Sequence, residues 1–462
     1  MGYSLWLKRP LARLNQLVFD YRLYQPTRAF AALIAIMAVR ALVDDIYHAF
    51  GGPGRWSMFF DPADLFADFA KVATAYKFAF TDVMAKGQYS YWPQLFQDYL
   101  LNNLGAADDS LRNINDPHSH TITTLHIPPL TVIIFVLGAM TMASAGPMAA
   151  VLGFMVAYMA LGVAVMRIFA HLCDAPRPVM WFCGFALCLS YPAIWMLTRE
   201  NVAGFAMLLV FFYLLTLWAD RWRWMGWIAL GLALNLRPEP AVLVLLELQG
   251  EAPVGRKLVR MIAPGLAAVG IAALSLQVIH ALYPVYTVEH FFKGLAIYHR
   301  VYAQGSMGND WNVSLQFLPR LLGKALGMGP GWDEITGKIF WAGGVAALVL
   351  GARKAARRGM DRHEWLFFLT ALPLLTLPVM AYYHLLRIVP LLVFLMLDLS
   401  QRPPRPGDSR LTLLGLVGLV VSPLGTNDTH GPIVALVLLV GCLFVMGRAG
   451  LVGAEGQVRP NG

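Results

Sequence analysis

The chain has 462 residues, of which 58% are hydrophobic and only 14% are charged, and its mean hydropathy is +0.57. Soluble domains are usually about 45–50% apolar and about 25% charged. This composition excludes a disordered protein, a secreted disulfide scaffold and an ordinary cytosolic enzyme. The apolar residues come in long runs, so we expect an all-α polytopic membrane protein that forms a single domain over residues 1–462.

The hydrophobic runs predict about 11–13 transmembrane helices, because each run is long enough to cross much of a hydrocarbon layer of about 30 Å. The run 224–249 also fits one hairpin of half-helices around Arg237 and Pro238. We expect the spans at 29–50, 128–146, 148–168, 178–197, 202–219, 224–236, 238–249, 261–283, 338–352, 364–382, 385–399, 411–424 and 431–447.

The net charge of +9 comes from basic residues in short clusters between the apolar runs. Cytoplasmic loops are rich in Lys and Arg, so this pattern favours a membrane topology over a nucleic-acid-binding face. It assigns the basic N-terminus (1–28) and the tail (448–462) to the cytoplasm. The same rule assigns there the clusters Arg221 and Arg223; Arg256, Lys257 and Arg260; Arg353, Lys354, Arg357 and Arg358; and Arg402, Arg405 and Arg410.

The outer face then holds two long loops and three short polar stretches. The first loop covers 51–127 and the second covers 284–337. The helices between 128 and 197 fit this order only with one further crossing or a re-entrant segment. The short stretches are 198–201, 237–240 and 381–387.

The first outer loop carries candidate acid–base residues. Asp64 and Asp68 are four residues apart and share one face if the segment is helical. One of them fits a general base above the membrane, although acidic residues are also common at a solvated helix start. Asp61 precedes them, and Asp44 and Asp45 come earlier still in the chain.

Metal binding and disulfides are not expected. His118, His120 and His126 lie near Asp116, but their spacing matches no zinc pattern. The four cysteines lie in or beside apolar runs without disulfide or zinc spacing, so they are read as core residues. No Gly-rich phosphate loop is present, which argues against an ATP-driven pump. We therefore predict neither a metal nor a cofactor.

The three short outer stretches interrupt apolar runs with charged and polar side chains, which are costly in a membrane and usually functional. Arg237 precedes a helix start and fits phosphate binding, while snorkelling or a structural Arg–Glu pair is the alternative. His384 and Arg387 fit either a site or an interface anchor. The other candidates in these stretches are Arg199 and Asn201.

The polar segments follow an order that resembles a known family. They are Asp68-Phe69, His126-Ile127-Pro128-Pro129-Leu130, Arg199 with Asn201, Gly226 and Gly231 before Arg237-Pro238-Glu239-Pro240, Asn312-Val313-Ser314-Leu315, and Pro378 through His384. Over roughly residues 30–400 this order resembles the GT-C superfamily of integral-membrane glycosyltransferases, particularly the polyprenyl-phosphate-mannose-dependent family 87. His126 stands where the family usually has Tyr, and Arg237 where it usually has Lys.

The resemblance implies inverting transfer of a sugar, most often mannose, from a polyprenyl phosphate to a lipid or glycan acceptor on the periplasmic face of the inner membrane. Asp68, or Asp64, would be the general base. The donor phosphate would contact Arg237, Arg199, His384 and Arg387. The substrate would contact His126, Asn201, Glu239 and Asn312.

Two other function classes share this composition. A lipid or polyol transporter or flippase would line its pathway with intramembrane Arg and His. The two halves of the chain have no repeated segment pattern, which argues against it. A non-catalytic membrane scaffold leaves the polar clusters of the outer face unexplained.

Overall fold

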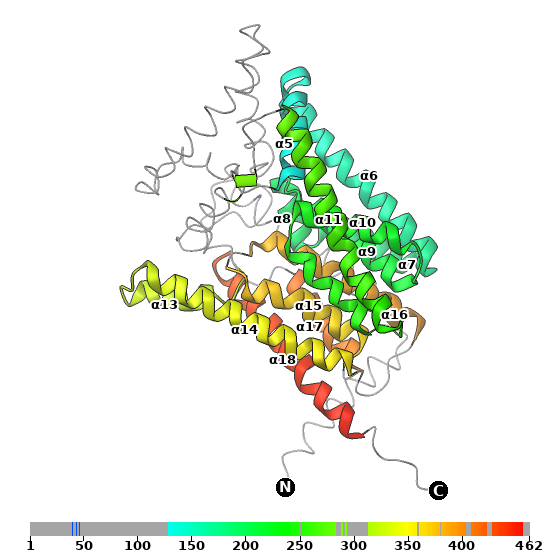
Figure 1. Cartoon of the computed structure of the whole chain (residues 1–462), viewed down its shortest axis with the longest axis vertical. Coiled ribbons are helices and arrows are strands. Elements are labelled where there is room, and N and C mark those ends of the chain that lie inside the picture. The colour runs from blue at the N-terminus through cyan, green and yellow to red at the C-terminus, as the bar shows by residue number, and fades with distance from the viewer. Residues whose placement is uncertain are drawn as a thin grey trace.

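The computed structural model describes residues 128–249, 251–282, 313–357, 360–378, 380–402, 408–422 and 427–455, together with positions 39, 43, 46, 288, 289 and 292. The continuous ranges are built from helices joined by short connections (Figure 1). In chain order these are α5 (Pro129–Ala145), α6 (Pro147–Cys173), α7 (Arg177–Leu189), α8 (Tyr191–Arg199), α9 (Ala203–Ala219), α10 (Arg223–Leu236), η3 (Glu239–Gln249), α11 (Val254–Leu282), α13 (Phe317–Ala325), α14 (Pro330–Ala356), α15 (Arg362–Thr376), η6 (Tyr382–Ile388), α16 (Val389–Gln401), α17 (Ser409–Val421) and α18 (Asn427–Glu455).

Five helices within the described residues are long and apolar enough to cross a membrane. A sixth crossing is possible by length if α7 and α8, which meet at a 49° bend, count as one broken span. The chain is therefore an all-α polytopic membrane protein, as its composition predicts. The five segments are Met148–Cys173, Val254–Ala281, Gly331–Ala356, Tyr382–Gln401 and His430–Arg448.

Within the described ranges every predicted run contains a helix, but α11 and α14 begin before the predicted runs 261–283 and 338–352, and the run 178–197 is divided into α7 and α8. The run 29–50 lies outside these ranges apart from isolated positions. Several runs form helices shorter than a full crossing, such as Ala203–Ala219 and Ser409–Val421. The run 224–249 forms α10 and the 3-10 helix η3, which turn at Arg237 and Pro238 as the hairpin alternative predicts.

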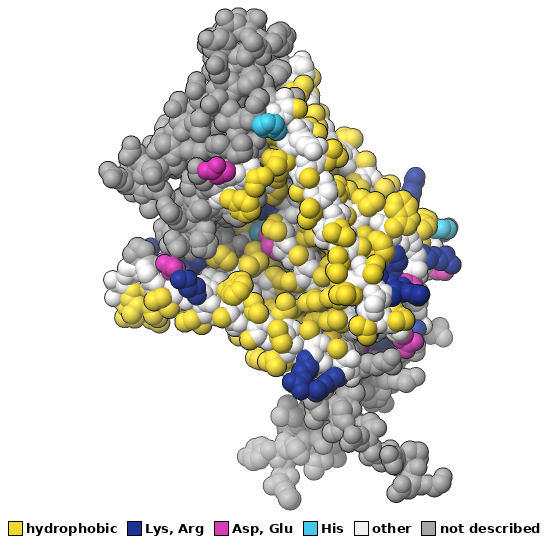
Figure 2. Space-filling view, in the orientation of Figure 1, with side chains coloured by type: hydrophobic (Ala, Val, Ile, Leu, Met, Phe, Trp, Pro, Cys, Tyr) yellow, Lys and Arg dark blue, Asp and Glu magenta, His cyan; other side chains and the backbone are white. Residues whose placement is uncertain are grey.

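The centre of the molecule is packed with aromatic side chains. Trp218 of α9 stacks on Phe394 of α16, with ring centroids 4.3 Å apart. Phe394 also meets Phe169 and Phe211 edge to face, at 6.5 Å and 5.8 Å. The outer surfaces of α11 and α14 remain hydrophobic and exposed. Figure 2 shows this broad apolar surface with Lys and Arg side chains gathered at its edges, as a lipid-facing surface requires.

Two glycines and an asparagine hold α10 close to its neighbours. Gly226 faces Thr216 of α9 and Gly231 faces Ala267 of α11, with no room for a Cβ at either position. Asn235 Nδ2 donates to the carbonyl oxygen of Ala268 at 2.8 Å. The end of α10 is therefore level with the middle of α11.

Polar residues collect at both ends of the α9–α10 hairpin. We call the end with Asn201 and Arg237 the site end, and the end with Asp220 and Arg223 the basic end. At the basic end, Arg223 Nη1 donates to Glu247 at 2.5 Å and Lys257 Nζ donates to the Leu248 carbonyl at 2.9 Å.

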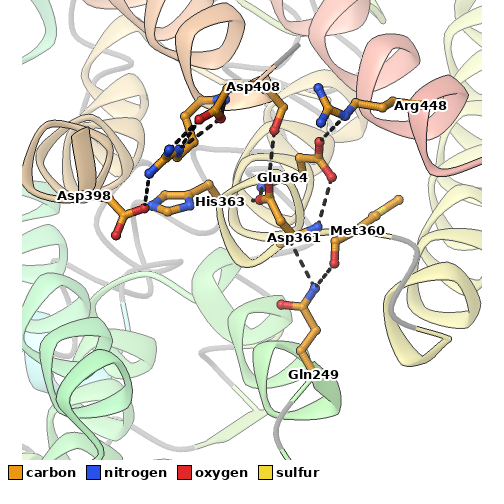
Figure 3. A network of polar contacts seen from close by, with 10 residues as sticks. Gln249, Met360, Asp361, His363, Glu364, Asp398, Asp408 and Arg448 are labelled. Carbon is orange, nitrogen blue, oxygen red and sulfur yellow. Dashed lines mark hydrogen bonds and ion pairs between the residues drawn. The ribbon is translucent and has the colours of Figure 1, made fainter. Parts of the chain in front are cut away.

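The start of α15 belongs to the basic end and carries a polar network that joins five helices (Figure 3). Asp361 and Glu364 cap the helix reciprocally, at 2.8 Å and 2.9 Å. Gln249 Nε2 donates to the Met360 carbonyl at 3.0 Å, and Arg448 Nε lies 3.3 Å from Glu364. Ser409 Oγ donates to Asp361 at 2.9 Å. Further ion pairs join Arg410 to Asp398 and Asp408.

The sequence assigns the basic clusters to one side of the membrane. Those of their residues that the structure describes lie together at the basic end. Arg362 strengthens this end by donating to the Leu217 carbonyl at 2.7 Å, with its guanidinium carbon 4.1 Å from the Trp218 ring centroid. Lys354 donates to the Met446 carbonyl at 2.5 Å.

Candidate functional site

Five of the predicted site residues meet at the site end. Asn201 lies between α8 and α9, and Arg237 lies between α10 and η3. Glu239 begins η3, and His384 and Arg387 lie on η6. The three short stretches that were predicted to share the outer face thus converge. Of the other predicted residues, Arg199 is the last residue of α8, and Asp64, Asp68, His126 and Asn312 lie outside the described residues.

Asn201 links two of these segments through its side-chain oxygen. It is buried, and its Oδ1 accepts from the Ala203 backbone N–H at 2.8 Å, so it caps the start of α9. The same oxygen accepts from Arg237 Nη2 at 3.1 Å. The cap of one helix therefore also orients the guanidinium at the end of another.

Glu239 links the other two segments through its carboxylate. Its Oε2 lies 3.0 Å from Arg387 Nη2, and its Oε1 lies 3.9 Å from His384 Nε2. Burial raises the pKa of Glu239, but Arg387, His384 and Arg237 outweigh this and lower it to about 2. Glu239 is therefore ionised at any physiological pH. The sequence left open a pair of Arg237 with a Glu, whereas the ion pair at 3.0 Å joins Glu239 to a different arginine, Arg387.

The backbone at the start of η3 contributes little to anion binding. Pro238 and Pro240 have no N–H, and the N–H of Ala241 donates to the Pro238 carbonyl at 3.1 Å. The expected helix N-terminal donors are thus mostly absent or occupied. Binding of an anion here depends on side chains.

Tyr383 is a further neighbour of Arg237. The Arg237 guanidinium carbon lies 5.8 Å from the Tyr383 ring centroid, so the ring supports this cation from a second side. Arg199 ends α8 and is half-buried. The site end therefore concentrates guanidinium groups and one imidazole around the Glu239 carboxylate.

Glu200 is a candidate that the sequence did not single out. It is fully buried, at 0% exposure, and its backbone has φ 53°, the left-handed region that favours glycine. Neither carboxylate oxygen has a hydrogen-bond partner among the described residues. Burial raises the pKa of Glu200 to about 8, so the neutral acid predominates near pH 7. In the sequence, the position of Glu200 between two apolar runs was the feature that could have identified it as a candidate.

The described end of the second long loop also reaches the site end. Val313 N–H donates to the Met380 carbonyl at 2.8 Å, and Ser314 Oγ donates to the Leu375 carbonyl at 3.1 Å. Arg320 is buried and donates to Gln316 Oε1 at 3.3 Å. These bonds fix the segment that follows Asn312 beside the chain that leads into η6.

Chemically, the site is suited to an anion more than to a metal. Arginine binds phosphate oxygens through several N–H donors. Within the described ranges, no group of three His, Cys, Asp or Glu side chains is placed to hold a metal ion. Comparison with models of protein families, with curated proteins and with solved structures finds no match to this chain. The resemblance to family 87 therefore stays a prediction.

Proposed function

We propose that the protein is a membrane glycosyltransferase that moves a sugar, most simply mannose, from a polyprenyl phosphate to a lipid-linked or glycan acceptor. The observation that carries this proposal is the convergence of Asn201, Arg237, Glu239, His384 and Arg387 at one end of the bundle. Three segments of the family-like pattern supply these residues except Arg387, which follows the last segment. These polar residues come from distant parts of the sequence. A shared binding site would explain why each of the three segments carries them.

In the proposed reaction the acceptor hydroxyl oxygen attacks the anomeric carbon of the donor sugar. The new C–O bond forms as the bond to the phosphate oxygen breaks, and the electron pair leaves with the lipid phosphate. Asp68, or Asp64, takes the hydroxyl proton as general base. Arg237, with Arg199, Arg387 and His384, stabilises the departing phosphate.

The substrate contacts in this proposal are His126, Asn201, Glu239 and Asn312. A lipid-phosphate leaving group carries less charge than a nucleotide diphosphate, so the proposal requires no metal ion or cofactor. Its partners are the lipid donor, the acceptor and membrane lipids. The site would face the periplasmic side of a bacterial inner membrane, since the basic end would face the cytoplasm.

A transfer assay with purified protein tests this proposal. The protein is incubated in lipid vesicles with labelled polyprenyl-phosphate mannose and a membrane lipid extract, and label is followed into new products. We expect transfer by the wild type and by Arg256→Ala, because Arg256 is exposed near the basic end. Movement of the labelled lipid between leaflets without transfer would instead support a flippase.

A further inference from the structure

The site end already holds an anion of its own, the carboxylate of Glu239. It lies 3.0 Å from Arg387 and 3.9 Å from His384, and its side chain is only 11% exposed. A phosphate that binds these two side chains must therefore either occupy the site together with this carboxylate or displace it. Two neighbouring anions repel strongly in a buried site, which favours replacement.

The ion pair with Arg387 has a feature that permits replacement. Although the two atoms are close, neither Arg387 Nη2 nor Glu239 Oε2 has a hydrogen bond with correct geometry among the described residues. Both ring nitrogens of His384 are also buried without a hydrogen bond there. The carboxylate thus neutralises charge but leaves directed donors unfilled, which phosphate oxygens could occupy.

The other end of the same helix gives an internal comparison. Glu247 lies near the end of η3, the helix that Glu239 begins, and it lies beside two cations, Arg223 and Arg260. There Arg223 makes a directed hydrogen bond to Glu247 at 2.5 Å. Asp220 adds a second carboxylate, 2.7 Å from Arg223. The basic end is thus locked by paired charges, whereas Arg387 contacts a single carboxylate among the described residues.

We propose that Glu239 is a resident counter-ion that holds Arg387 and His384 in the empty site and is displaced by the phosphate of the incoming ligand. This inference rests on the proposed function for the identity of the ligand. It makes the site selective, because a neutral lipid brings no charge to replace the carboxylate. The return of Glu239 to Arg387 then assists release of the lipid phosphate.

Binding of farnesyl phosphate, with farnesol as the neutral probe, tests the exchange. Glu239→Gln keeps the size of the side chain but removes the competing charge. We expect it to bind farnesyl phosphate about tenfold more tightly than the wild type. Coupling between buried charges changes affinity by about this factor or more. Glu239→Asp keeps the charge at a shorter reach and should fall between the two. Farnesol binding should not change.

Glu247→Gln is the matched control, a buried carboxylate on the same helix with two cationic neighbours. It should unfold at a lower temperature yet leave farnesyl phosphate affinity unchanged. Unchanged or weaker binding by both Glu239 variants would overturn the inference, as would equal tightening by Glu247→Gln. If the wild type binds farnesyl phosphate and Glu239→Gln tightens it, but no sugar is transferred, the proposed function fails and the counter-ion exchange stands.

Discussion

Asn201 Oδ1 accepts a hydrogen bond from Arg237 Nη2 at 3.1 Å, across a sequence separation of 36 residues. The bond joins the turn between α8 and α9 to the turn between α10 and η3. Because the same oxygen caps α9, the direction of the Arg237 guanidinium is coupled to the start of that helix. Substitutions at Arg237 therefore test binding without removing a helix cap.

Arg237→Ala should reduce kcat/KM for the polyprenyl-phosphate donor by about 10²–10³-fold, the usual effect of losing one donor to developing negative charge. Arg237→Lys should keep partial activity, because a point charge still attracts phosphate but loses the forked geometry. Initial transfer rates at several donor concentrations measure both. Near-wild-type rates for both variants would make Arg237 a structural anchor.

Glu200→Gln should change how stability depends on pH. The pKa of Glu200 is raised to about 8 from an ordinary value of 4.5, so the folded state keeps a proton that the unfolded chain releases. Stability from this group is full below pH 4.5 and is lost as the pH rises through about 8, by up to about 1.4 kcal/mol per pH unit. Gln cannot ionise. The melting temperature of the Glu200→Gln variant should match that of the wild type near pH 5 and exceed it near pH 8, by roughly a few degrees.

The control for this measurement is Glu334→Gln on α14. Glu334 is exposed and pairs with Lys338 at 2.6 Å, so its loss should leave the pH dependence unchanged. Thermal unfolding in detergent across this pH range compares the three proteins. A Glu200→Gln variant that is less stable than the wild type near pH 8 would mean that the carboxylate has a stabilising partner.

Single cysteines at Gly329 and Arg357 should be labelled from opposite sides of the membrane. These exposed residues flank α14, whose 27 residues extend about 40 Å. With the native cysteines replaced, an impermeant thiol reagent should label Gly329→Cys in intact cells and Arg357→Cys only after lysis. A cysteine at Asn312 should behave like the one at Gly329. The reverse pattern would put the site end in the cytoplasm.

Asp68→Asn should reduce transfer by about 10²–10⁴-fold, as expected for loss of a general base, while donor binding persists. Asn keeps the size of the side chain and removes its basicity. Asp61→Asn serves as the control and should be active. An inactive Asp64→Asn beside an active Asp68→Asn would move the role to Asp64. Activity in all three would exclude this group of carboxylates and direct the test to Asp44 and Asp45.

The helices and their grouping by end were accessible from the sequence because both follow from local properties. The runs of apolar residues mark the helices, and the break at Arg237 and Pro238 marks the turn into η3. The basic clusters at α10, α11, α14 and α17 were assigned to one side by charge alone. Their meeting at the basic end agrees with that assignment.

The pairings were not accessible, because they join residues that only the tertiary fold brings together. Nothing in the spacing links Glu239 to Arg387, or Arg448 to Glu364. The importance of Glu200 was also hidden, since its burial and left-handed backbone depend on the turn between α8 and α9. The 3-10 geometry of η3 was likewise not encoded in the hydrophobic pattern.

The hydrogen bond from Asn235 to Ala268 has a consequence for depth. It fixes the end of α10 beside the middle of α11, and α11 continues to Leu282, about 20 Å further along its axis. The ring of Phe154 on α6 contacts that of Phe205 on α9, so the first residues of α6 also extend past the start of α9. The guanidinium of Arg237 thus lies below the ends of these two helices. An anionic head group would therefore have to pass the ends of these helices to reach it.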